Sequence, residues 1–162
     1  MNNLETLSLI ELSMTDKVKK ITLLTAVCLA LAILNGYFFN FINDKFFHFT
    51  SDENGLAHLP IEAKLAIIVF LAPIIETVIF QFIPIEILKN TKLRNPVFLI
   101  LIPSLIFAGA HWYHFIYIIM AFVGGIILNY YYVETQKISK YSFLLVVLLH
   151  SLYNLYGFIF VV

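Results

Sequence analysis

Four polar side chains that can exchange protons or donate hydrogen bonds stand in stretches of the sequence that are otherwise apolar. Glu76, His111, His150 and Asn154 each interrupt a run of hydrophobic residues. A carboxyl and an imidazole group can hold and activate a water molecule, and neutral imidazole and amide groups can stabilise an oxyanion. An ionisable group at lipid depth costs about 2.5 kcal/mol or more, so it usually faces the interior of a helix bundle. The set therefore indicates a composite polar site inside a helix bundle.

The composition places these residues in a membrane protein. Of the 162 residues, 61% are hydrophobic and 12% are charged, and the mean hydropathy is +0.92. An ordinary soluble domain has about twice that charged share, so this chain lacks the polar side chains to cover a water-facing surface. Ten basic residues balance ten acidic ones, which gives no support to nucleic-acid binding. The one cysteine, Cys28, excludes an internal disulfide and a cysteine-based metal cluster.

Apolar runs close to the ~20 residues that cross a bilayer predict a single all-α domain over residues 1–162, a polytopic bundle of about five transmembrane helices. The predicted spans are residues 21–42, 61–88, 96–112, 113–132 and 141–162. Helical spacing of apolar residues in 1–16 indicates a short helix on the membrane surface, and 43–60 is predicted to be an external loop. Pro73 and Pro84 predict that the second span is kinked or broken at depth.

The basic residues predict how the bundle is oriented. Five spans leave only Lys45 and Lys64 on one side, and the other side carries Lys17, Lys19, Lys20, Lys89, Lys92, Arg94, Lys137 and Lys140. The positive-inside rule then makes the N-terminus cytoplasmic and the C-terminus external. Because the chain is rich in Ile, Phe, Asn and Lys, we expect a multi-pass protein of a bacterial inner membrane.

The four polar residues are predicted to share one depth. At ~1.5 Å per residue they fall within about two helical turns of a common level, on three different spans. His150 and Asn154 are four residues apart and share a helix face, as do Phe107 and His111. Polar groups at one depth on separate helices are what a composite site requires.

The spacing of residues along the chain also predicts one helix–helix contact and one ion pair. The turn at residues 111–114 is short, so the third and fourth spans should pack as antiparallel neighbours, with the small residues Ala121 and Gly125 at their contact. Glu86 lies one helical turn from Lys89 and can pair with it at the cytoplasmic interface.

Structural roles compete with catalysis at each candidate position. Glu76 could instead hydrogen-bond a broken helix. His111 and His114 also suit the membrane interface, and His150 and Asn154 could simply hold helices together. His48 and His58, in the external loop, are expected to be solvated. Phe107 is expected to be a packing residue whether or not the site is catalytic.

The order of these residues resembles the CPBP family, which comprises the CAAX proteases and the bacteriocin-processing enzymes also called Abi proteins. The family motifs are Glu-Glu-x-x-x-Arg, Phe-x-x-x-His and His-x-x-x-Asn on successive core helices. Here the corresponding segments begin at Glu76, Phe107 and His150, and the resemblance covers roughly residues 65–157. It implies a helical membrane bundle with protease activity.

The first motif departs from the family pattern at two positions. Thr77 stands in place of the second Glu, and Gln81 in place of the Arg. The two are four residues apart, so in a regular helix they share a face and could still hydrogen-bond. We interpret them as a neutral replacement for a structural ion pair, because losing both charges avoids a lone buried one.

The resemblance implies specific roles for the polar residues. Glu76 is the general base, His111 its water-orienting partner, and His150 with Asn154 forms the oxyanion hole. It implies catalysis without a metal or other cofactor, although two histidines and a glutamate could also ligate zinc. The implied partners are membrane lipid and a peptide or protein substrate at the membrane. For a short chain of bacterial composition, we favour an unprenylated substrate such as a bacteriocin precursor or a membrane-protein tail.

Two other functions remain open at this stage. Thr77 and Gln81 are compatible with a non-catalytic membrane protein of the same fold, such as a scaffold or a bacteriocin-immunity factor. The third hypothesis is a transporter or a haem carrier, in which Glu76 relays protons or His111 and His150 ligate haem. Five spans without a second polar relay make transport the weaker choice.

Overall fold

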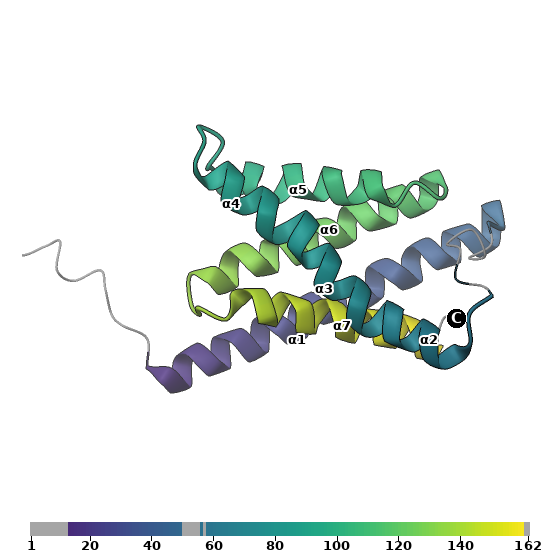
Figure 1. The fold of residues 1–162 in the computed structure, drawn as a ribbon, viewed down its shortest axis with the longest axis horizontal. Coiled ribbons are helices and arrows are strands. Elements are labelled where there is room, and N and C mark those ends of the chain that lie inside the picture. Colours follow the sequence, from purple (N-terminus) through teal and green to yellow (C-terminus); the bar gives the residue numbers. More distant parts are fainter. Residues whose placement is uncertain (1–12, 50–55, 57, 161–162) are drawn as a thin grey trace, which may run out of the picture.

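The structure is a computed structural model that describes residues 13–49, 56 and 58–160, and this part of the chain contains helices and no strand. In chain order the elements are α1 (Met14–Ile42), η1 (Asn43–Phe47), α2 (Ile61–Leu65), η3 (Ala66–Leu71), α3 (Ala72–Glu76), η4 (Thr77–Phe82), α4 (Ile83–Lys89), α5 (Pro96–Ala110), α6 (Phe115–Gln136) and α7 (Ser142–Phe160). The elements labelled η are short π-helices, whose turns are wider than those of an α-helix. The predicted all-α bundle is confirmed (Figure 1).

Four helices are long and apolar enough to cross a membrane, and α5 is a shorter apolar helix. Their outward faces carry large apolar side chains, for example Leu34 at 62%, Phe70 at 60% and Leu144 at 61% exposure. A soluble surface would not expose so many such groups, whereas lipid solvates them. The protein is therefore an integral, multi-pass membrane protein.

Helix α1 begins earlier than the predicted span and ends at the same residue, Ile42. Ser13 caps its N-terminus by accepting a hydrogen bond from the Asp16 main-chain N–H at 3.1 Å, and this cap lets the helix start at Met14. Of the predicted surface helix over 1–16, residues 13–16 form the cap and first turn of α1. Residues 1–12 lie outside the described residues.

The predicted loop over 43–60 is also shorter than expected. Residues 43–47 continue α1 as the π-helix η1, which ends at His48 in the left-handed region with φ 59°. The Asn43 side chain bridges this end, since it donates to the Phe49 carbonyl at 2.9 Å and accepts from the Phe49 N–H at 3.1 Å. His48 and His58 are exposed, as predicted.

The second span, which was predicted to be kinked or broken, is one continuous helix from Ile61 to Lys89. Pro73 and Pro84 each sit near the start of an α-helical segment, directly after a π-helical one. Proline removes a main-chain donor and crowds the preceding turn, and a wider turn accommodates both effects. The prolines thus change the winding of the helix without interrupting it.

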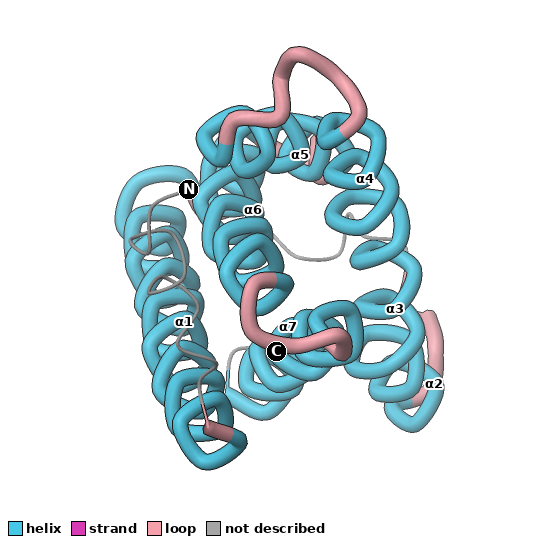
Figure 2. Tube along the Cα trace, turned by 90° about the vertical axis from the view of Figure 1, so that its left-hand side faces the viewer, coloured by secondary structure: helices cyan, strands magenta, loops and turns pink. Residues whose placement is uncertain are grey.

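Helices α5, α6, α7 and the second span form a ring, and α1 lies outside it against α6 and α7 (Figure 2). The antiparallel packing of α5 and α6 is confirmed. Ala121 and Gly125 are buried, and a Cβ on Gly125 would lie 3.1 Å from the Ser104 Cα. The small residues therefore set how closely these two helices approach.

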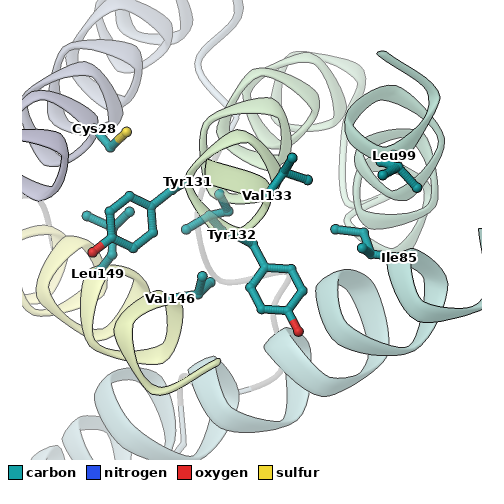
Figure 3. Packing of buried hydrophobic residues seen from close by; sticks show 9 residues of the cluster. Cys28, Ile85, Leu99, Tyr131, Tyr132, Val133, Val146 and Leu149 are labelled. Carbon is teal, nitrogen blue, oxygen red and sulfur yellow. The ribbon is translucent and has the colours of Figure 1, made fainter. Parts of the chain in front are cut away.

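A hydrophobic core fills the lysine-rich end of the ring. Its members are buried side chains from α1, α4, α5, α6 and α7, several of which are seen in Figure 3: Cys28, Ile85, Leu99, Leu128, Tyr131, Tyr132, Val133, Val146 and Leu149. At the same end Glu86 accepts from Lys89 at 2.6 Å and from Gln136 at 3.1 Å. The predicted Glu86–Lys89 pair is therefore present.

Candidate active site

The predicted site residues of three helices converge on one carboxyl oxygen. Glu76 Oε2, at the end of α3, lies 3.5 Å from His150 Nε2 of α7 and 3.9 Å from His111 Nε2 at the end of α5. The side chains of Glu76, His111 and His150 are 24%, 13% and 4% exposed, respectively. A single oxygen thus faces two imidazole rings in a largely buried setting.

These groups lie in the wall of a pocket of about 500 Å³. This volume is within the range of pockets that hold small molecules or short peptide segments. Asn154, His114, Tyr117 and Tyr153 line the same pocket. Glu76 therefore has both buried polar partners and space in front of it.

His111 is held in one orientation by its own helix. Its Nδ1 lies 2.7 Å from the carbonyl oxygen of Phe107. A carbonyl oxygen only accepts, so Nδ1 carries the proton, and in the neutral ring Nε2 presents a lone pair toward Glu76. Helix α5 has 15 residues, or about 22 Å, which is shorter than the ~30 Å hydrocarbon layer. The His111 side chain is mostly buried, whereas its neighbour Trp112 is 77% exposed.

His150 is the most deeply buried of the three groups. Its Nδ1 has no hydrogen-bond partner in the described part of the chain. A donor left without an acceptor in the interior is less favourable than an under-used acceptor, so the neutral ring with the proton on Nε2 fits this environment. That proton points toward Glu76 and the pocket.

Asn154, one turn after His150, has a structural contact as well as a pocket position. Its Nδ2 donates to the Ile68 carbonyl oxygen at 2.8 Å. The Ala72 N–H donates to Ile67 instead, and Pro73, next in line, has no N–H. Asn154, rather than Glu76, therefore satisfies the carbonyl that the proline region leaves without a helical donor.

Thr77 and Gln81 do not form the hydrogen bond that their spacing predicts. Both are fully buried, and neither the Thr77 hydroxyl nor either polar atom of the Gln81 amide has a partner among the described residues. They lie in the π-helix η4, where the wider turn takes residues four apart out of alignment. The prediction assumed α-helical geometry and is wrong for this reason.

Phe107 and His114 are placed beside the site with different roles. Phe107 is buried, and its ring packs 5.5 Å from Phe80 and 4.2 Å from His111 between centroids, so its predicted packing role is confirmed. His114 caps α6 by accepting from the Tyr117 N–H at 3.2 Å, and its ring stacks on Phe49 at 4.5 Å. His114 therefore fixes the α5–α6 turn.

Two tyrosines of the pocket, Tyr117 and Tyr153, were not predicted from the sequence. The Tyr117 ring lies 5.7 Å from the His111 ring. Tyr153, between His150 and Asn154 in sequence, approaches α1 at Gly36, where a Cβ would lie 3.1 Å from the Tyr153 hydroxyl. The position of Tyr153 within the His-x-x-x-Asn motif was the signal that could have found it.

A zinc ion would need a group of ligating side chains close together. Within residues 13–49, 56 and 58–160, the structure has no group of three or more His, Cys, Asp or Glu residues arranged to hold a metal ion.

The fold and the site define a class of protein: a polytopic helical membrane protein with a buried carboxyl group between two imidazoles. The family model described as type II CAAX prenyl endopeptidase Rce1-like matches residues 58–156, which include all of these groups. The chain belongs to this Rce1-like family of CAAX-type intramembrane proteases, as the resemblance to the CPBP family predicts. No curated protein and no solved structure matches the chain.

Proposed function

We propose that this protein is an intramembrane endopeptidase in which Glu76 activates water to hydrolyse a peptide bond. The observation that supports it is the position of Glu76 Oε2 between the Nε2 atoms of His111 and His150, at 3.9 and 3.5 Å. We further propose a bacterial inner membrane as its location and an unprenylated peptide, such as a bacteriocin precursor or membrane-protein tail, as its substrate.

The nucleophilic water would sit between Glu76 and His111. Their 3.9 Å separation is too long for a direct hydrogen bond, but a water oxygen ~2.8 Å from both atoms fits it. Glu76 accepts one hydrogen of this water, and the lone pair of His111 Nε2 accepts the other. The water's own lone pair is then free to attack a carbonyl carbon.

The reaction follows from these donors and acceptors. As the water oxygen bonds to the carbonyl carbon, its proton passes to Glu76 and the carbonyl oxygen becomes an oxyanion. His150 Nε2–H and the second Nδ2 hydrogen of Asn154, whose first is used by Ile68, stabilise that charge. Protonated Glu76 then gives its proton to the leaving nitrogen as the C–N bond breaks, which yields a carboxylic acid and an amine.

The test compares two glutamates of the same span. Purified wild type, Glu76→Gln and Glu86→Gln are each incubated with a library of internally quenched peptides that includes a farnesylated CAAX sequence. We expect the wild type and Glu86→Gln to release the same fragments, identified by mass spectrometry, and Glu76→Gln to lose at least about 100-fold in rate. Equal cleavage by all three proteins rejects the proposed role of Glu76.

A non-catalytic role, as a scaffold or immunity factor, is favoured by one observation. Thr77 and Gln81 replace the charged pair of the family motif, and their polar atoms are buried without partners in the described chain. In cells that the protein protects from a bacteriocin, retained protection by Glu76→Ala supports this role over proteolysis.

A further inference from the structure

We infer that the pocket receives its substrate from the non-cytoplasmic side of the membrane, as a peptide segment without charged side chains. This inference rests on the proposed protease function for the identity of the occupant. The side of access rests on the pocket itself and on the placement of the basic residues, and it can be measured without any catalysis.

The pocket is confined to one half of the bundle. In α1, α5 and α7, the first residues along the chain that line the pocket are Ala32, Phe107 and Leu149. In the second span and in α6, the last lining residues are Glu76 and Leu128. Helices α1, α5 and α7 run in the opposite direction to the second span and α6 (Figure 1). The residues that line the pocket therefore all lie toward the same end of the bundle.

The other half of the bundle is closed. Leu128 and Leu149 belong both to the pocket wall and to the hydrophobic core, so the core forms the floor of the pocket. Beyond the core, Glu86 joins Lys89 and Gln136. A peptide entering from that end would have to displace packed side chains such as Tyr131 and Tyr132, both almost fully buried.

The pocket lies at the end of the bundle away from the basic loops. Asn40 and Asn43 at the end of α1, Tyr113 in the α5–α6 turn and Tyr156 near the end of α7 line this part of the pocket. Eight of the ten basic residues occupy the opposite end of the bundle, where the α4–α5 and α6–α7 connections lie (Figure 1). Basic loops remain cytoplasmic, so the end of the bundle that holds the pocket faces outward.

The chemistry of the wall favours an uncharged segment. Among the described lining residues there is no lysine, arginine or aspartate, and Glu76 is the one acidic group. Neutral amide and phenol groups such as Asn40, Tyr113 and Tyr153 can bond to peptide main chain, and apolar side chains form much of the remaining wall. An acidic side chain placed here would be desolvated without a lysine or arginine partner, which is unfavourable. A basic side chain could pair only with Glu76, the group that the proposed reaction needs as its base.

The side of access is tested by thiol labelling of single-cysteine proteins. In a Cys28→Ala background, Tyr113→Cys at the pocket mouth and Lys92→Cys in the α4–α5 loop are both exposed positions. Spheroplasts are treated with a membrane-impermeant maleimide before and after permeabilisation. We expect Tyr113→Cys to be labelled in intact spheroplasts and Lys92→Cys only after permeabilisation. The reverse pattern, or equal labelling of both in intact spheroplasts, overturns the inference.

A cleavage assay tests whether the pocket takes an uncharged peptide segment from the proposed side of the membrane. A quenched peptide with an uncharged centre and a polyethylene-glycol tail, which prevents crossing, is added to right-side-out and to inverted vesicles. We expect cleavage at least tenfold faster with right-side-out vesicles, and at least tenfold slower when two central residues are lysine. Faster cleavage by inverted vesicles overturns the inference. Absence of cleavage in both rejects the protease proposal and the peptide occupant, while the labelling result still decides the side of access.

Discussion

Asn154 Nδ2 donates a 2.8 Å hydrogen bond to the main-chain carbonyl oxygen of Ile68, which joins α7 to the π-helical turn that precedes Pro73. The same two helices carry His150 and Glu76, whose reactive atoms are 3.5 Å apart. The bond therefore holds the two sides of the site at a fixed separation. It gives Asn154 a structural contribution in addition to the oxyanion role that we propose.

Replacing Asn154 should lower stability as well as activity. We expect Asn154→Ala to lose about 1 kcal/mol of unfolding free energy, or about 2–4 °C in melting temperature. Asn154→Asp should lose more, because a carboxylate would face the Ile68 carbonyl. Cys28 is the one cysteine and is buried, so a thiol-reactive dye reports unfolding in detergent. Unchanged melting of both variants contradicts the structural role.

The two histidines of the α5–α6 turn should separate catalysis from folding. We expect His111→Ala to reduce cleavage by about 100-fold or more, because the water would lose its orienting partner. His114→Asn keeps a side chain that can cap α6 and should retain activity within a few-fold. Peptide cleavage by the two purified variants, normalised to folded protein, is the measurement. Equal losses would place His114 in the reaction or remove His111 from it.

Two glycines test the contact between α5 and α6. A Cβ on Gly125 would meet Ser104 Cα at 3.1 Å and Phe107 at 3.2 Å, whereas a Cβ on Gly109 would meet nothing within 4 Å. We expect Gly125→Ala to destabilise by about 1–3 kcal/mol through overpacking. Gly109→Ala should instead stabilise by up to about 1 kcal/mol through helix propensity. The melting temperatures of the two variants are compared in detergent. Similar shifts in both would show that the close approach of α5 and α6 at Gly125 does not limit stability.

The unpartnered polar side chains of η4 should be replaceable by apolar ones. We expect Thr77→Val and Gln81→Met to leave the melting temperature unchanged or raise it, because no hydrogen bond to the described chain is lost. Asn129→Leu is the matched contrast, since Asn129 Nδ2 donates to Ser104 Oγ at 3.1 Å and to the Gly125 carbonyl at 2.9 Å. If the melting temperature of Thr77→Val falls as much as that of Asn129→Leu, the Thr77 hydroxyl has a hydrogen-bond partner, such as a buried water.

The sequence by itself determined the membrane class, the number of apolar segments and the candidate residues. Long apolar runs have one stable solution in lipid, which is a helix with all main-chain groups satisfied. Polar residues such as Glu76, His111 and His150 are conspicuous in such runs because lipid depth penalises them. Their shared depth followed from the constant rise of a helix.

Only the tertiary structure decided which atoms meet. Thr77 and Gln81 lie in the π-helix η4, whose wider turn removes the alignment that α-helical spacing predicts. The Ile68 carbonyl gains Asn154 as a partner because another helix happens to pass it. Helix rotation and contacts between distant segments depend on packing of the whole bundle, and local spacing in a sequence does not encode them.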